Sequence, residues 1–156
     1  MLGALLRRPL RALSSRVAAD LAAAGFADLR PSHLVVFQGL DADGSRLTDL
    51  AARAHMTKQS MGALVDDLER MGYVERVPDA ADGRVKIVRR TGRGWEVERA
   101  ARASVGAFEA EWAAQIGADR MRGFRSVLED FAADEADRAR SATAPPSPHR
   151  PATRPR

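Results

Sequence analysis

Thr57 to Ser60 form a polar run at the start of a segment whose apolar residues recur at helical spacing. Gln59 can bond adenine through a paired donor and acceptor, and Lys58 can bond a guanine edge or a phosphate. Thr57 or Ser60 can contact a phosphate or a thymine methyl group, and the small Gly62 permits close approach. The segment therefore predicts a helix that contacts bases in the major groove. The alternative is a solvated helix face with a good N-terminal cap.

A second group of candidate contact residues lies in a turn-rich stretch further along the chain. Arg84 follows Gly83, and its guanidinium can enter the narrow, electronegative minor groove. Arg76 and Lys86 are weaker candidates for contacts with phosphates, and ordinary surface charge is an equal alternative for each. Asp82 is unexpected in this stretch because a carboxylate repels phosphate. The group predicts a second contact with the nucleic acid.

The positive charge of the chain is concentrated in particular segments. The net charge is +4, and residues 138–156 carry five arginines and no acid, so the remainder is near neutral. Residues 46–93 hold ten basic and seven acidic side chains, whereas residues 94–137 hold five basic and ten acidic ones. Because phosphate neutralisation supplies most non-specific affinity for DNA, the basic excess in residues 46–93 favours this segment as the contact region.

Two helices are predicted before the polar run. Pro9 fits the first turn of a helix whose leucines and valine recur every three or four residues until Gly25 ends it. Ser32 is a suitable cap for a short, largely buried helix that ends before the turn at residues 41–44. These helices are expected to support the contact region.

The polar run itself belongs to a predicted pair of short helices. Thr48 caps the first, which ends near His55, and Thr57 caps the second, which ends at Gly72. Two short helices separated by about three residues are typical of a helix-turn-helix unit.

The period of the pattern changes after this pair. Residues 73–77 and 84–89 alternate like strands around a turn-rich stretch, which predicts a two-stranded hairpin. Apolar residues at heptad spacing then predict two longer helices in an antiparallel hairpin that turns near Asp119.

The predicted fold class is mainly α with a small β wing, a winged helix-turn-helix with terminal dimerisation helices. Residues 1–45 form N-terminal helices for dimerisation and scaffolding, and residues 46–91 form the DNA-binding domain. Residues 92–140 form a C-terminal helical hairpin for dimerisation. Residues 141–156, rich in proline and arginine, form a disordered basic tail.

Residues 47–76, together with Asp82-Gly-Arg84 and Thr91-Gly-Arg-Gly94, resemble the MarR family of small-molecule-responsive regulators. The resemblance is strong over about residues 30–95, and the flanking helices match in order and length. It implies that Asp82 pairs with an arginine and so fixes the shape of the wing. It also implies an effector pocket between the dimer helices and the winged domain. Aromatic residues with a few polar groups could line it, with core packing as the alternative for each: His33, Phe37, Trp95 and Trp112.

The ends of the chain predict a homodimer. They carry more apolar surface than one small domain can readily cover, and relatives in the family dimerise through their terminal helices. The alternative is packing within one chain. The residues concerned are Leu2, Leu5, Leu6, Leu10, Phe124, Leu128 and Phe131.

Several classes of protein are excluded. Cysteine is absent, which rules out disulfides, thiolate metal sites and cysteine nucleophiles. The three histidines lack ligand spacing on one helix, and no common catalytic motif is present. The sequence therefore predicts no enzyme activity, no cofactor and no metal. No apolar run reaches the roughly 18 residues that span a bilayer, so we expect no membrane partner and a cytoplasmic location.

The function that the sequence favours is sequence-specific DNA-binding transcriptional regulation. The expected partners are a palindromic double-stranded operator, a second copy of the chain and a small-molecule effector. We expect a repressor that a small aromatic or phenolic effector releases from DNA. One alternative is a winged helix that serves as a protein–protein interaction module. Another is sequence-neutral compaction of DNA, which predicts a stronger positive charge than the near-neutral body provides.

Overall fold

A computed structural model describes the chain from residue 1 to residue 143, apart from the side chains of Leu2 and of residues 135–143. Residues 144–156, which make up most of the expected basic tail, lie outside the described residues. The chain divides into two compact units, Met1–Ala110 and Glu111–Arg156. Each unit is considered by itself.

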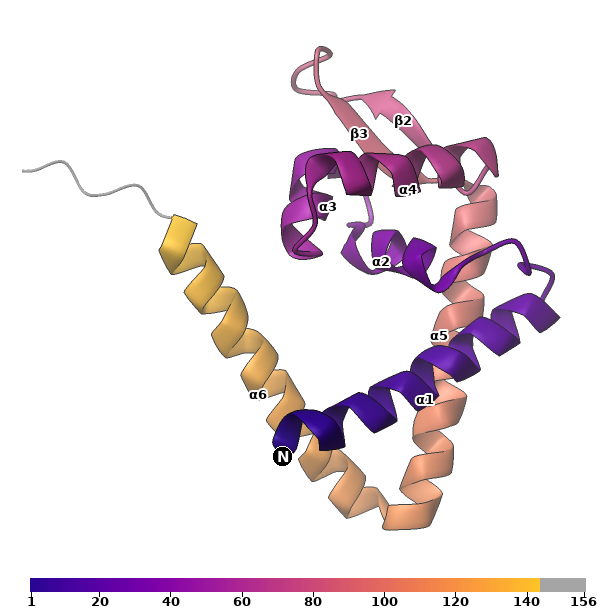
Figure 1. Cartoon of the computed structure of the whole chain (residues 1–156), viewed down its shortest axis with the longest axis vertical. Helices are drawn as coiled ribbons and strands as arrows, with labels where there is room; N and C mark the ends of the chain where they lie inside the picture. Colours follow the sequence, from indigo (N-terminus) through magenta and orange to yellow (C-terminus); the bar gives the residue numbers. More distant parts are fainter. Residues whose placement is uncertain (144–156) are drawn as a thin grey trace, which may run out of the picture. The chain divides into compact units, whose positions relative to one another are not determined.

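The first unit holds the winged helix-turn-helix elements (Figure 1). Helices α3 and α4 form the helix pair, and strands β2 and β3 form the wing, so the predicted fold class is confirmed. The elements are α1 (Leu2–Ala23), α2 (Pro31–Gly39), β1 (Ser45–Arg46), α3 (Leu47–Arg53), α4 (Lys58–Arg70), β2 (Val74–Pro78), β3 (Lys86–Arg90) and most of α5 (Gly92–Ile116).

Helix α1 begins earlier than predicted, because Pro9 lies inside it and not at its first turn. Proline removes one backbone hydrogen bond and costs helix stability. The alanines, leucines and arginines on both sides of Pro9 are strong helix formers, however, and they continue the helix. The predicted end is confirmed, since Gly25 has a φ of 96°.

Two predicted caps are wrong, and one is confirmed. Arg30 is the cap of α2 and Pro31 is its first residue, which leaves Ser32 inside the helix. Thr48 also lies inside its helix: the cap is Arg46, because the extended backbone of β1 continues up to the first turn of α3. Thr57 caps α4 as predicted, and its Oγ1 accepts a hydrogen bond from the Ser60 N–H at 3.1 Å.

The strands form a three-stranded antiparallel sheet in the order β1-β3-β2. Val74 pairs with Arg90 and Pro78 with Lys86, and this pairing sets the register of the wing. Strand β1 was not predicted, because two residues are too few to show alternation. It pairs Ser45 with Val88 and so joins the segment before α3 to the wing.

The core of the first unit lies between the helix pair, the sheet and α2. Helix α4 contributes Met61, Val65 and Leu68 from one face, all fully buried. The opposite face of α4 is therefore left for solvent or a partner. The other buried apolar residues are Val17, Leu21, Val36, Phe37, Leu40, Leu50, Ala51, Tyr73, Val74, Val88 and Val97.

Arg90, at the end of β3, is a buried cation whose side chain is only 4% exposed. Its guanidinium donates to the backbone carbonyls of Phe37 at 2.8 Å, Leu40 at 3.0 Å and Asp41 at 3.0 Å. It also pairs with Glu98 of α5 at 3.2 Å. These five residues are called the buried arginine site. They join the end of α2 to the sheet and to α5.

The start of α5 packs closely against the junction of α4 and β2. A Cβ atom at Gly94 would lie 2.1 Å from the carbonyl oxygen of Tyr73, so no other residue fits there without a shift of the backbone. Thr91 N–H donates to the same carbonyl at 3.1 Å, and Thr91 Oγ1 donates to the carbonyl of Gly72 at 2.7 Å. Gly72 has a φ of 78°, which confirms the predicted end of α4.

The second unit contains the last turns of α5, a break at Gly117 and α6 (Ala118–Thr143). Gly117 has a φ of 91°, so the predicted break between the two long helices is confirmed. Helix α6 continues past the expected boundary at residue 140. Among the described residues, no helix is long and apolar enough to cross a membrane. The exposed apolar residues of this unit are Ile116, Phe124, Val127, Leu128 and Phe131.

Candidate nucleic-acid interface

The first turn of α4 presents the predicted polar residues to solvent. Thr57, Lys58, Gln59 and Ser60 are all exposed, whereas the next residue, Met61, is fully buried. The hydroxyls of Thr57 and Ser60 are engaged with each other at 2.9 Å. Lys58 and Gln59 are therefore the side chains of this turn with free hydrogen-bonding groups. The N-terminal end of a helix also favours anions through its free N–H groups.

Gly62 lies half-buried on the side of α4 that faces α3. A Cβ atom there would lie 3.8 Å from the side chain of Leu47, which is an ordinary contact. Packing against α3 therefore does not require glycine at this position.

The second half of α4 carries three carboxylates, and each has an arginine partner. Asp67 pairs with Arg30, which precedes α2, and with Arg70 at 3.0 Å. Arg70 and neighbouring groups hold the pKa of Asp67 below its usual value. Asp66 and Glu69 both pair with one arginine of the wing, described next. Pairing offsets the negative charge that would otherwise repel a phosphate.

Arg76 of β2 is that arginine, and its side chain is 25% exposed. Its guanidinium bonds Glu69 and, at 2.6 Å, Asp66, and its backbone N–H donates to Glu69 at 3.0 Å. Arg76, Asp66 and Glu69 are called the paired cluster. The cluster connects α4 to the wing, so its arginine has fewer donors to offer than the sequence suggests. A phosphate contact by Arg76 stays a prediction.

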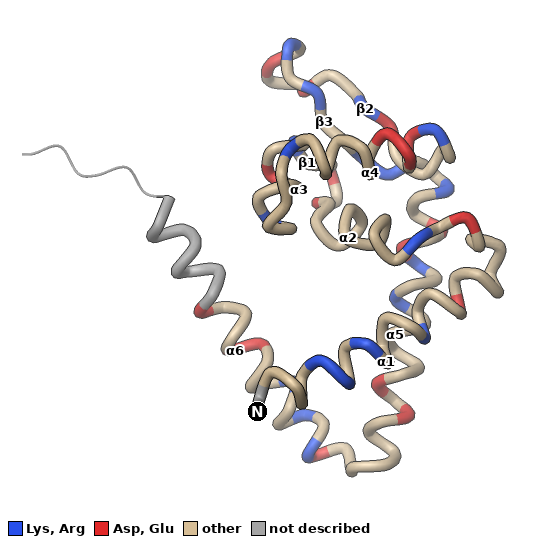
Figure 2. Tube along the Cα trace, viewed as in Figure 1, with Lys and Arg blue, Asp and Glu red and all other residues tan. Residues whose placement is uncertain are grey.

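The loop of the wing exposes Arg84, and Lys86 follows it at the start of β3. Within the described part of the chain neither cation has a carboxylate partner, and the same is true of Lys58. Lys58, Gln59, Arg84 and Lys86 are called the open polar surface. Figure 2 shows basic residues along the wing and acidic residues in the second half of α4.

Asp82 does not have the predicted arginine partner among the described residues. Its carboxylate accepts a hydrogen bond from the backbone N–H of Arg84 at 3.1 Å, which closes the turn locally. Asp79 is the loop carboxylate that pairs with an arginine. It accepts from Arg46 at 3.1 Å and from the Ala81 N–H at 2.9 Å. The Ala81 N–H and Arg46 lower the pKa of Asp79. No pattern in the sequence indicated this pair, because β1 was not predicted.

Two of the predicted pocket residues lie in the core. The Arg30 N–H donates to Nδ1 of His33 at 3.1 Å, the Arg30 guanidinium lies 2.9 Å from Nε2, and the His33 side chain is 1% exposed. Burial, with help from Arg30, lowers the pKa of His33. Phe37 packs edge-on against Tyr73, with ring centroids 6.4 Å apart. Their packing supports the core alternative for both residues.

The two tryptophans lie in different units. Trp95 is half-buried at the start of α5, and the Arg90 guanidinium lies 4.9 Å from its ring centroid. Trp112 belongs to the second unit. An effector pocket lined by His33, Phe37, Trp95 and Trp112 therefore stays a prediction.

The helix pair, the antiparallel wing and the polar first turn of α4 define the class of winged helix-turn-helix proteins. A family profile described as the MarR family matches residues 33–85. The chain is 30% identical over 133 residues to the HTH-type transcriptional repressor Rv2887 of Mycobacterium tuberculosis, a match that covers 85% of this chain and 94% of the relative. The chain belongs to the MarR family.

Solved structures are similar over most of the chain. CouR from Rhodococcus jostii RHA1, bound to p-coumaroyl-CoA, is 27% identical with a TM-score of 0.66, covering 84% of this chain and 91% of that one. Rv2887 of Mycobacterium tuberculosis in complex with p-aminosalicylic acid is 29% identical with a TM-score of 0.63, covering 85% and 98%.

Proposed function

We propose that this chain is a sequence-specific DNA-binding transcriptional regulator that represses by occupying its operator. The observation that carries the proposal is the open polar surface, in which the first turn of α4 and the wing expose cations without carboxylate partners. Surface cations elsewhere in the winged domain are held by acids, as in the paired cluster. The repressor name of the Rv2887 relative supports the same function.

Each element of the surface has a chemical role in this proposal. The first turn of α4 enters the major groove, where Gln59 bonds a base edge and Lys58 bonds a guanine or a phosphate. Thr57, Ser60 and Gly62 allow the helix to approach the DNA closely. Arg84 enters the minor groove from the wing, and Lys86 bonds a phosphate. In this proposal the protein needs no catalytic group, cofactor or metal, and it acts in the cytoplasm with the DNA.

A homodimer completes the binding unit, because one short recognition helix contacts few base pairs. Leu5, Leu6 and Leu10 of α1 are 66%, 45% and 63% exposed, and α6 has its own exposed apolar residues. A second copy would bury these residues and place two recognition helices on a palindromic operator.

We propose a small aromatic or phenolic compound as the effector that releases the DNA. Support comes from relatives that bind p-coumaroyl-CoA or p-aminosalicylic acid. The competing function is a winged helix that binds only proteins. Such a module would carry apolar or acidic residues on the outward surface of α4, whereas this chain carries Lys58 and Gln59 there.

The direct test is a quantitative gel shift with DNA fragments recovered from genomic binding. We expect Arg84→Ala to weaken operator binding at least about tenfold, because a hydrogen bond to a charged group contributes about 1.5–3 kcal/mol. Arg99→Ala is the matched control, since it removes the same exposed charge from α5. Equal affinity of the Arg84→Ala and Arg99→Ala variants would contradict the role of the wing. Absence of any preferred fragment would contradict sequence-specific regulation.

A further inference from the structure

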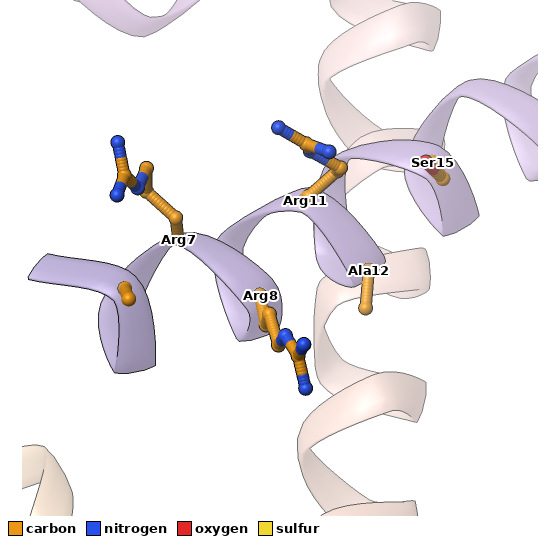
Figure 3. Close-up of a pocket in the computed structure, with 6 residues that line it drawn as sticks. Arg7, Arg8, Arg11, Ala12 and Ser15 are labelled. Atoms are coloured by element: carbon orange, nitrogen blue, oxygen red, sulfur yellow. The ribbon is translucent and has the colours of Figure 1, made fainter.

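The first half of α1 carries an arginine-rich hollow that the proposed DNA contacts do not use. Ala4, Arg7, Arg8, Arg11, Ala12 and Ser15 line it. Figure 3 shows Arg7 and Arg11 extended to one side of the helix and Arg8 to the other. The side chains of Ala4, Ala12 and Ser15 are small, so they leave room between the guanidinium groups.

The charge of this face has no partner within the described chain. Arg7, Arg8 and Arg11 are exposed, and no described carboxylate pairs with any of them. Residues 1–19 contain no acid at all. Like charges three or four residues apart destabilise a helix, as Arg7 and Arg8 do with Arg11. The arginines therefore cost stability in the chain alone, and an anionic ligand would reverse that cost.

The apolar side of α1 lies roughly opposite Arg8 and Arg11, and Arg7 lies between the two sides. Leu6, Leu10, Leu13 and Val17 follow helical spacing. Arg8 is offset from this apolar stripe by about half a turn, Arg11 by somewhat less, and Arg7 by about a quarter turn. Val17 is buried, whereas Leu6 and Leu10 are exposed. A second copy that covered the leucines would therefore leave Arg8 and Arg11 open to a ligand, with Arg7 at the edge of the covered surface.

We propose that Arg7, Arg8 and Arg11 bind the phosphate groups of an aromatic acyl-coenzyme A thioester, which is the effector class of this regulator. The inference rests on the proposed function, because it names the effector of the same protein. A free aromatic acid has one carboxylate and needs one cation. Coenzyme A has a diphosphate and a separate phosphate, whose spread charges match guanidinium groups on both sides of the hollow. Arginine bonds phosphate through two parallel N–H donors.

The position of α1 separates this face from the proposed DNA contacts. Within the first unit, the N-terminal end of α1 lies far from the wing formed by β2 and β3 (Figure 1). The phosphates of a duplex held by the wing are therefore a poor match for the arginine face. The relative bound to p-coumaroyl-CoA shows that a similar chain takes a ligand of this class.

The test is calorimetric titration of the full-length protein with p-coumaroyl-CoA, p-coumarate, coenzyme A and inorganic diphosphate. The variant replaces Arg7, Arg8 and Arg11 with Gln, a good helix former. We expect it to lose at least about tenfold in affinity for p-coumaroyl-CoA and to keep the wild-type affinity for p-coumarate. The control variant replaces Arg99, Arg120 and Arg122 with Gln, which removes the same charge, and it should bind p-coumaroyl-CoA like the wild type.

Four results of these titrations would overturn the proposal. The first two are equal binding of p-coumaroyl-CoA by the wild type and the α1 variant, and a loss of p-coumarate affinity in the α1 variant as large as its loss of p-coumaroyl-CoA affinity. The other two are binding of diphosphate as tight as that of p-coumaroyl-CoA, and no binding of p-coumaroyl-CoA by the wild type. A gel shift on the same samples keeps the two proposals distinct. Operator binding by the wild type upholds the proposed function whatever the thioester does. Operator binding lost in the α1 variant alone would assign these arginines to DNA and overturn the effector site.

If the Gln variant fails to fold by circular dichroism, the replacement of all three arginines with Lys takes its place. Lysine keeps the charge but loses the paired donors of guanidinium. We expect weaker binding of p-coumaroyl-CoA and unchanged binding of p-coumarate. Unchanged binding of both ligands would overturn the role of the arginines.

Discussion

Two arginines on the same hairpin, six positions apart, have opposite surroundings. Arg84 belongs to the open polar surface and has no described carboxylate partner, whereas Arg90 is the centre of the buried arginine site. Arg90 satisfies three backbone carbonyls and one carboxylate. The residue type alone therefore does not determine whether a cation stabilises the fold or is free to bind a partner. Its place in the hairpin does, since Arg84 lies in the exposed loop outside the paired residues and Arg90 lies at the buried end of β3.

Variants at the two kinds of site should differ in what they change. Substitutions in the buried arginine site should change the free energy of unfolding, and substitutions in the open polar surface should change DNA binding alone. The paired cluster lies between these extremes, because Arg76 is partly exposed and bonds two carboxylates.

The largest effect is expected from Arg90→Ala. Removal of the guanidinium leaves the buried carbonyls of Phe37, Leu40 and Asp41 without their donor and leaves Glu98 with Arg102 alone, and loss of one partner of a buried pair costs about 3–5 kcal/mol. Urea unfolding followed by circular dichroism measures the loss. Arg84→Ala is the control and should change the free energy of unfolding by less than about 0.5 kcal/mol. Similar losses in the two variants would remove the distinction between the two arginines.

Gln59→Ala tests the open polar surface, where DNA binding and not stability should change. We expect the variant to lose discrimination at one base pair of the operator by about 1–3 kcal/mol, because the paired bonds to a base edge are gone. Its stability should stay at the wild-type value. Gel shifts against a set of single-base operator variants measure the preference. A uniform loss of affinity across all base pairs would instead mean that Gln59 contacts the backbone.

Arg76→Gln tests the intermediate case. We expect a loss of stability of about 1 kcal/mol, since partly exposed ion pairs contribute little more. The dependence of DNA affinity on salt should stay unchanged, because Arg76 is held by acids and releases no counterion. Arg84→Gln should lower the salt slope by about one. An equal reduction in Arg76→Gln would show that the paired cluster opens to bind a phosphate.

The smallest effect concerns His33, whose pKa burial lowers in the folded chain. The unfolded chain takes up a proton near the ordinary value of about 6.5, whereas the folded chain resists it. Stability should therefore be complete above that value and fall as the pH decreases below it. Thermal melts from about pH 7.5 to about pH 5.5 measure this decrease, which His33→Gln should reduce. An equal pH dependence in the two proteins would assign the decrease to other groups.

Local patterns were sufficient for much of the recognition helix. Apolar spacing, the cap at Thr57 and the glycine at position 72 act within a few residues, and all three predictions are confirmed. The exposure of Lys58 and Gln59 follows from the same spacing. Such features depend on the chain's own helical period, and the sequence contains them directly.

Pairings between distant segments could not be predicted in the same way. The bond from Arg90 to the Phe37 carbonyl joins residues 53 positions apart, and Asp79 pairs with Arg46 through a strand of two residues. The arginine partner predicted for Asp82 is absent among the described residues. The carboxylate of Asp82 instead accepts from the Arg84 N–H within the same turn. The start of α1 was missed because strong helix formers outweighed the cost of Pro9.

The contact of Gly94 with the Tyr73 carbonyl has a mechanical consequence. No space separates the first turn of α5 from the residue that begins the wing, and Thr91 bonds the same carbonyl. A displacement of the first turn of α5 toward the sheet must therefore move the Tyr73 carbonyl and the start of β2 with it. Only Thr91 separates β3 from α5, so a displacement of the first turn of α5 reaches the base of the wing directly.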